Sequence, residues 1–222
     1  TKDRSSMNAL FKQLVKQNCT IISKPGEFND FAGGYGFEIL DPDNRRLRFR
    51  TDALKLTSNK KWGYPDKVSH VVLNTPDMEL LQDFFTSVLG FRVSDYSGDQ
   101  MVFLRCNNEH HTIALSRSNH PSVNHVAFDL SSIDEFMHSI GRMKQAGHDV
   151  SWGPGRHGPG NNPFAYFVSP PGFVVEFTTE LQIINEKKHQ PKVWSRNDPA
   201  SMDLWMTAGP PSTAQRTAMQ GK

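Results

Sequence analysis

Two histidines and one glutamate are the residues of this sequence with the clearest capacity for chemistry. His70 lies in V-S-H-V-V-L, His125 in V-N-H-V-A-F and Glu176 in V-V-E-F. An unpaired carboxylate in such an apolar run costs several kcal/mol, so a cation or a metal ion must compensate Glu176. Two imidazoles and one carboxylate form a facial triad that leaves positions open on a first-row metal, which suits Fe(II). The three residues therefore predict a metal centre, with three unrelated buried polar residues as the alternative.

Two repeats of strand, helix and further strands are expected to position these side chains. The first repeat predicts a strand, a helix and three strands at residues 69–73, 77–88, 91–95, 101–105 and 112–116. The second predicts the same order at residues 124–129, 132–145, 150, 164–168 and 173–178. His70 and His125 fall in the first strand of each repeat. If the repeats are related by a pseudo-twofold axis, both imidazoles can converge on that axis.

The front of the chain resembles the last repeat but lacks its carboxylate. A helix and three strands are predicted there, at residues 5–17, 19–23, 37–40 and 47–50. Residues 41–49 (D-P-D-N-R-R-L-R-F) align with residues 169–177 (S-P-P-G-F-V-V-E-F), so Arg48 takes the place of Glu176. A guanidinium has no lone pair to give a metal. We expect an incomplete first module, in a chain that is a fragment or lacks its front end.

Composition excludes several function classes. The 222 residues carry a net charge of +2 with acids and bases interspersed, so no basic block points to nucleic acid or a membrane surface. No apolar run approaches the roughly 18 residues of a spanning helix, and the first residues do not read as a signal peptide. The two cysteines, Cys19 and Cys106, form no C-x-x-C pair and are expected to be free thiols. We therefore expect a cytoplasmic protein.

Two longer motifs identify a family resemblance. They are W-G-P-G-R-H-G-P-G-N-N-P-F-A-Y-F-V-S-P-P-G-F-V-V-E-F at residues 152–177, and N-N-E-H-H-T-I-A-L at residues 107–115. This pattern resembles the vicinal oxygen chelate superfamily, and within it the two-domain extradiol ring-cleaving dioxygenases. The resemblance implies an α+β fold of paired βαβββ modules (vicinal oxygen chelate or glyoxalase-like), with the first module incomplete. It is close over residues 68–181 and looser in front.

The resemblance also implies a domain order and a set of site residues. We expect a non-metal module remnant, a linker, a catalytic metal-binding module and an extended or partly disordered tail, at residues 1–53, 54–66, 67–181 and 182–222. The metal ligands of the family match His70, His125 and Glu176. Its acid–base histidine matches His111, two further polar groups of its pocket match His157 and Tyr166, and its pocket wall matches Val72 and Phe103. The remaining histidines are assigned to the surface: His120, His138, His148 and His189.

The activity implied by the resemblance is cleavage of a catechol-type ring next to its two hydroxyls, with both atoms of O2 entering the product. Fe(II) is the expected cofactor, and the same ligands can hold Mn(II). A homo-oligomer and a place in aromatic hydrocarbon catabolism are also expected. Two alternatives stay open: a metal-dependent lyase, isomerase or thiol transferase of the glyoxalase type, and a non-catalytic binding module. The glyoxalase-type alternative needs no proton-handling histidine such as His111 and no G-R-H-G…Y set, and the complete His/His/Glu ligand set argues against a non-catalytic module.

Overall fold

The computed structural model describes residues 2–55 and 61–221, which divide into two compact units. Unit 1 contains the described residues up to 55 together with Glu79–Leu89, and unit 2 contains the rest. The predicted linker at residues 54–66 lies partly outside the described residues. None of the helices in the described ranges has both the length and the apolar character needed to cross a membrane.

Unit 1 is a three-stranded antiparallel sheet with one long helix. Its elements are α1 (Arg4–Lys16), β1 (Ile21–Glu27), β2 (Tyr35–Leu40) and β3 (Arg46–Thr51), with strand order β1-β2-β3. The short helices α2 (Met78–Asp83) and η1 (Phe84–Val88) also fall largely in this unit. On β3, Arg48 Nη2 lies 2.6 Å from Glu38 Oε1. Unit 1 therefore places an ion pair at the position that the internal repeat equates with Glu176.

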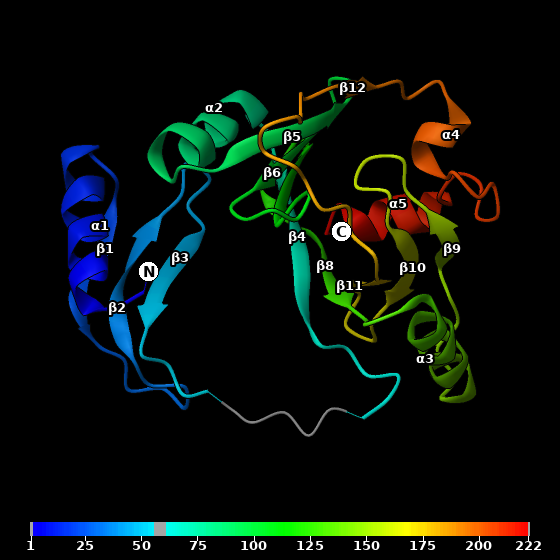
Figure 1. The fold of residues 1–222 in the computed structure, drawn as a ribbon, viewed down its shortest axis with the longest axis horizontal. Helices are drawn as coiled ribbons and strands as arrows, with labels where there is room; N and C mark the ends of the chain where they lie inside the picture. Colours follow the sequence, from blue (N-terminus) through cyan, green and yellow to red (C-terminus); the bar gives the residue numbers. More distant parts are fainter. Residues whose placement is uncertain (1, 56–60, 222) are drawn as a thin grey trace. The chain divides into compact units, whose positions relative to one another are not determined.

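Unit 2 is built on a nine-stranded mixed sheet (Figure 1). Its strands are β4 (Lys67–Thr75), β5 (Arg92–Ser97), β6 (Met101–Arg105), β7 (Ile113–Arg117), β8 (Ser122–Asp129), β9 (Trp152–Arg156), β10 (Pro163–Val168), β11 (Val174–Thr178) and β12 (Val193–Trp194). The strand order is β12-β5-β6-β7-β4-β8-β11-β10-β9. This mixed α+β architecture confirms the predicted fold class.

The sheet consists of two modules that meet at its centre. In each module the first strand pairs in parallel with the last, β4 with β7 and β8 with β11, and the other strands of the module pair antiparallel. The edge strand β12, from the tail, pairs in parallel with β5. The antiparallel pair β4–β8 joins the modules. The central strands β4, β8 and β11 are neighbours, so the strands that carry His70, His125 and Glu176 lie side by side.

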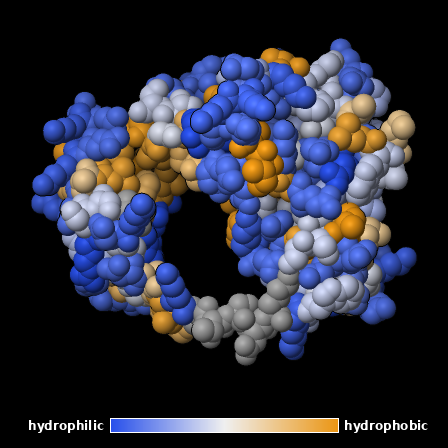
Figure 2. All heavy atoms as spheres, in the orientation of Figure 1, coloured by the Kyte–Doolittle hydropathy of each residue, from blue (hydrophilic) through white to orange (hydrophobic). Residues whose placement is uncertain are grey.

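Helix α3 (Ile133–Gln145) covers one face of the second module. It buries Phe136 and Ile140 against Phe167 and Phe177 of β10 and β11. Because side chains alternate between the two faces of a strand, Tyr166 and Glu176 must point to the opposite face. Apolar burial under α3 therefore directs the polar residues of these strands into the site. The face of this unit that Figure 2 shows is mainly hydrophilic, with separate small hydrophobic patches.

Two predicted elements differ from the structure. A strand was expected at residue 150. The structure has β9 (Trp152–Arg156) instead, which lies in the glycine- and proline-rich run. Gly155 packs so closely that a Cβ there would lie 2.6 Å from Phe164 Cζ, and a Cβ on Gly153 would lie 2.7 Å from the Phe164 carbonyl oxygen. These glycines allow close packing within a strand, although such a run usually indicates a loop. The predicted helix at 77–88 is interrupted, because its second half is the π-helical turn η1.

The tail was expected to be extended or partly disordered, and this expectation was wrong. It contains β12, α4 (Pro199–Met202) and α5 (Thr213–Met219). Hydrogen bonds join it to the sheet: Trp194 Nε1 donates to Asp95 Oδ2 at 2.8 Å, and the backbone N–H of Arg156 donates to Asp203 Oδ1 at 2.9 Å. Apolar tail side chains also pack against the buried cluster around Trp152 and Phe164. The polar composition of the tail therefore gave no indication that specific hydrogen bonds hold it against the sheet.

Candidate metal centre

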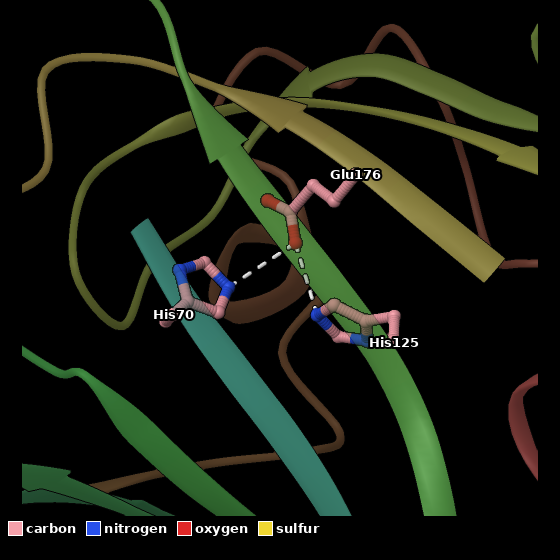
Figure 3. A group of neighbouring side chains, drawn as sticks. All are labelled: His70, His125 and Glu176. Carbon is pink, nitrogen blue, oxygen red and sulfur yellow. Dashed lines mark ion pairs between the residues drawn. The ribbon is translucent and has the colours of Figure 1, made fainter. Parts of the chain in front are cut away.

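The three predicted ligands meet at one point on the sheet. His70 Nε2 lies 3.3 Å and His125 Nε2 lies 3.0 Å from Oε2 of Glu176. One potential ligand atom from each of the three residues lies within 4.8 Å of the other two. Figure 3 shows the three side chains turned towards one another from β4, β8 and β11. The arrangement brings two neutral nitrogen donors and one carboxylate to one small volume.

Strand register explains why these side chains share a face. His70 pairs with Ala127 on β8, and Ala127 pairs with Glu176 on β11. Glu176 in turn pairs with Tyr166 on β10. His125 precedes Ala127 by two residues and therefore points to the same face. Ala127 is fully buried, and its small side chain leaves the space between the ligands open.

The buried polar atoms of this cluster fit a metal ion. Both carboxylate oxygens of Glu176 and Nε2 of His125 are buried and lack a hydrogen-bond partner. Such orphaned atoms are rare in folded proteins unless something else satisfies them. Burial opposes ionisation of Glu176, yet the neighbouring His70 and His125 hold its pKa well below the usual value. An ionised carboxylate with two imidazoles is a donor set for a first-row divalent metal.

An outer layer of hydrogen bonds orients the imidazole of His125. Its Nδ1 lies 2.8 Å from the side-chain oxygen of Asn124 and must donate to it, which leaves Nε2 as the metal-facing lone pair. Asn124 in turn donates to Asn74 at 2.9 Å. The ring of His70 has Ser69 Oγ at 3.2 Å from its Nδ1. Sequence reasoning missed Asn74 and Asn124, although Asn124 immediately precedes a predicted ligand.

The proposed acid–base histidine lies beside the ligands. The ring centroids of His111 and His70 are 4.2 Å apart, and Phe103 lies 5.1 Å from His111 on another side. Burial, followed by the neighbouring His70, lowers the pKa of His111 well below its ordinary value. A buried imidazole that stays neutral is suited to accept a proton.

His157 and Tyr166 form a hydrogen-bonded pair on the opposite side of the pocket. His157 Nδ1 donates to the carbonyl oxygen of Met202 at 3.1 Å, so its Nε2 is the acceptor for the Tyr166 hydroxyl, also at 3.1 Å. Burial, reinforced by the charge of Glu176, raises the pKa of Tyr166 well above its usual value. Tyr166 therefore keeps its proton and remains a hydrogen-bond donor.

These groups line a cavity of about 460 Å³. Val72 and Phe103, predicted as wall residues, both line it, and they flank Ala114 in one row across β4, β7 and β6. The tail also contributes to the wall, through residues that no motif indicated: Arg196, Asp198, Ser201, Met202, Pro211, Arg216, Met219 and Gln220. The volume suits a small organic ligand held next to the metal ligands.

Comparison with known proteins places the fold and the site in one family. The Glyoxalase/Bleomycin resistance protein/Dioxygenase superfamily matches residues 67–177. Metapyrocatechase 2 of Cupriavidus necator is 32% identical over 222 aligned positions, which cover 90% of this chain and 67% of that protein. This chain belongs to that superfamily. The resemblance to vicinal oxygen chelate proteins is therefore confirmed.

Other relatives and solved structures differ in identity and in the share of the chain that they cover. 2,2',3-Trihydroxybiphenyl dioxygenase of Sphingomonas paucimobilis is 32% identical over 126 positions, covering 54% of this chain and 43% of that protein. Among solved structures, the Mn(II)-bound glyoxalase from Novosphingobium aromaticivorans has a TM-score of 0.87 at 41% identity, covering 96% of this chain and 71% of that one. Homoprotocatechuate 2,3-dioxygenase from Arthrobacter globiformis has a TM-score of 0.79 at 21% identity, covering 97% and 70%, and shows a shared fold. The chain thus spans less than half of one curated relative and about two thirds of the other.

The histidines assigned to the surface are not all exposed in this superfamily member. His138 and His148 are exposed, whereas His120 and His189 are partly buried. His189 Nε2 donates to the Ser94 carbonyl oxygen at 2.7 Å. His110, for which sequence reasoning found no role, is fully buried. No periodic pattern distinguishes it from His111, so only the packing of the chain separates the two neighbours.

Proposed function

We propose that this chain is an extradiol dioxygenase that cleaves the ring of a catechol-type substrate next to its vicinal hydroxyls and incorporates both atoms of O2. The observation that carries the proposal is the position of His111, a buried neutral base whose ring lies 4.2 Å from that of the ligand His70. Simple metal binding does not require such a base. Relatives named metapyrocatechase and 2,2',3-trihydroxybiphenyl dioxygenase support the same activity.

His70, His125 and Glu176 would hold the metal. We propose Fe(II), with Mn(II) as the alternative, because relatives are named as an iron-dependent extradiol dioxygenase and as a manganese-dependent one. When bound, the metal supplies positive charge that favours the deprotonated catechol and brings it next to O2. The ligand set of two neutral imidazoles and one carboxylate leaves a net +1 at the centre, which suits a catechol anion.

The other residues of the pocket handle the substrate and its protons. His111 accepts the proton of a catechol hydroxyl and later returns a proton to the product oxygen, because its imidazole is buried and neutral. Tyr166 can turn its hydroxyl from His157 to a substrate oxygen and donate a hydrogen bond there. Val72 and Phe103 provide the apolar wall for the aromatic ring.

The organisation of the whole protein is part of the same proposal. The catalytic module is residues 67–181, preceded by a non-metal module remnant at 1–53 and a linker at 54–66. The tail at 182–222 completes the pocket wall in unit 2. A homo-oligomer in the cytoplasm, acting on a small aromatic substrate and O2, remains our expectation for the assembled protein.

A second candidate is an isomerase of the glyoxalase type. It is favoured by the Mn(II)-bound glyoxalase from Novosphingobium aromaticivorans, which is 41% identical to this chain. Such an isomerase would consume no O2. Oxygen uptake therefore separates the two functions, and the metal content alone does not.

The test is an anaerobic metal analysis followed by an oxygen-electrode screen of substituted catechols. The dioxygenase takes up one O2 per catechol, and ¹⁸O2 places two labelled atoms in the product. His111→Phe should keep metal and substrate binding but lower kcat by about 10²–10⁴-fold, the usual contribution of a general acid–base. His148→Phe, at an exposed histidine, is the matched control and should retain activity. Absence of O2 uptake with every catechol would reject the proposal.

A further inference from the structure

A chain of buried side chains leads away from His111, on the side remote from the metal ligands. His111 Nδ1 lies 3.0 Å from Nδ1 of His110. His110 Nε2 lies 3.2 Å from Oδ2 of Asp95. His110 and Asp95 are 0% and 2% exposed, so no bulk water competes for these bonds. Neither residue lines the pocket, and the proposed mechanism does not use them.

Asp95 is fixed as the acceptor at the end of this chain. Trp194 Nε1 donates to its Oδ2 at 2.8 Å, and the backbone N–H of Lys192 donates to its Oδ1 at 3.0 Å. Burial opposes ionisation, but the hydrogen bonds from His110, Trp194 and Lys192 hold the pKa of Asp95 below its usual value. The carboxylate is therefore ionised at neutral pH and can only accept.

The acceptor fixes the tautomer of His110. Burial lowers the pKa of His110, so its ring is neutral and carries one N–H. That proton must be on Nε2, because the atom facing it is a carboxylate oxygen. Nδ1 of His110 is then a lone pair, and the ring nitrogen 3.0 Å away must supply the hydrogen. His111 consequently carries its proton on Nδ1.

We propose that Asp95 and His110 are positioning residues that hold His111 in the Nδ1–H tautomer and leave its Nε2 as a bare lone pair. Nε2 makes no hydrogen bond to any described residue, and His111 lines the pocket. The proposal rests on the proposed function and extends it. When a catechol O–H bond breaks, the proton forms a new bond to Nε2, and His111 becomes an imidazolium.

The hydrogen bonds from His111 to His110 and from His110 to Asp95 then stabilise the imidazolium. Its Nδ1–H continues to donate to His110, and this bond becomes charge-assisted and therefore stronger. The polarised ring of His110 in turn donates its Nε2–H to the ionised carboxylate of Asp95. The tail enters the mechanism here, since Trp194 and Lys192 hold the carboxylate in place from about one hundred residues further along the chain, the Trp194 bond spanning 99 positions. Without these hydrogen bonds, His111 could carry its proton on Nε2. That nitrogen could then not accept a proton from the substrate.

Two variants separate the tautomer effect from general loss of structure. His110→Leu removes the acceptor for His111 and should lower kcat about 10–100-fold, part of the about 10²–10⁴ that a general base contributes, with KM and metal content unchanged. Asp95→Asn is the conservative control. Two donors converge on Oδ2, from Trp194 and His110, so the amide oxygen should take that position and preserve the tautomer. Its NH2 group then faces the backbone N–H of Lys192, so Asp95→Asn should lower stability while kcat falls less than in His110→Leu.

The direct readout is ¹⁵N NMR of histidine-labelled, metal-free protein, with His111 assigned by its loss in His111→Phe. Wild-type His111 should show a protonated Nδ1 and a bare Nε2, and Asp95→Asn should keep this pattern. His110→Leu should shift the equilibrium towards Nε2–H. A wild-type His111 protonated on Nε2, or an unchanged kcat in folded His110→Leu, would overturn the inference. Wild-type protein without O2 uptake would instead reject the proposed function, and the NMR spectrum would still decide the tautomer.

Discussion

Ala127 on β8 lies in register with Glu176 on β11, and its methyl group is fully buried. On its other side Ala127 pairs with His70 on β4. The smallest chiral side chain thus stands between two of the candidate metal ligands, on a central strand of the sheet. The volume that a longer side chain would fill is the volume on which the ligands converge.

Ala127→Leu should therefore abolish metal binding. The added atoms would occupy the space between His70 and Glu176, and overpacking should also cost about 1–3 kcal/mol of stability. Ala165→Leu is a matched control, because Ala165 is equally buried in the same sheet but packs in the cluster under α3. Metal per chain and the thermal midpoint measure the two effects. Equal loss of metal in both variants would show that the position of Ala127 is not special.

Asn124→Leu should weaken metal affinity about 10–100-fold, the usual cost of losing an outer-shell partner. Asn124 accepts the Nδ1–H of His125 at 2.8 Å and so presents Nε2 to the metal. Asn124→Asp keeps an acceptor at this place and should retain most of the affinity. Competition with a chelator under anaerobic conditions gives both dissociation constants. Equal affinities in the leucine and aspartate variants would remove Asn124 from this role.

Tyr166→Phe should lower kcat while the metal content stays at the wild-type level. The hydroxyl is the only hydrogen-bonding group of the Tyr166 side chain, and losing one such donor to a reacting oxygen costs up to about 10²–10³-fold. The control is Tyr64→Phe, at an exposed tyrosine outside the pocket-lining set. Steady-state kinetics on the best catechol of the oxygen-electrode screen measures the difference. Full turnover by Tyr166→Phe would leave the hydroxyl with a structural role only.

Asp203→Asn should loosen the tail. Asp203 Oδ1 accepts backbone N–H bonds from Arg156 and Trp205, and Oδ2 accepts them from Thr207 and Ala208. An amide can replace only one of these oxygens, so we expect a loss of about 2–3 kcal/mol, the scale of hydrogen bonds to a charged group. Denaturant unfolding measures it. Asp149→Asn, at an exposed aspartate, should change stability little.

The same carboxylate gives a pH dependence with a definite sign. Burial opposes ionisation, but the four backbone N–H bonds hold the pKa of Asp203 below its usual value. A depressed carboxyl pKa stabilises the fold above the unfolded value of about 3.9, and this contribution is lost as pH falls through the folded pKa. Wild type should therefore approach Asp203→Asn in stability below about pH 4. A constant difference from pH 7 to pH 3 would contradict this assignment.

The sequence by itself indicated the order of the modules and the candidate metal ligands, which the structure brings together. His70 and His125 could be found because each occupies the first strand of a repeat, and the alternation of strand residues fixes which side chains share a face. Arg48 identified the front module as the one without a metal ligand, because it takes the place of Glu176 in the internal repeat. Glu176 stood out because a carboxylate among valines and phenylalanine requires compensation. Each of these signals is local, or repeats at a fixed interval along the chain.

Only the tertiary structure decided what surrounds the ligands. The bonds from Asp95 to His110 and to Trp194 join residues 15 and 99 positions apart, and no periodic pattern records such a pairing. The strand in the glycine-rich run and the order of the tail were missed because close backbone approach and polar anchoring leave no apolar periodicity. Periodicity encodes which face a residue occupies, whereas the partner it meets there depends on strand register and on segments brought together from far along the chain.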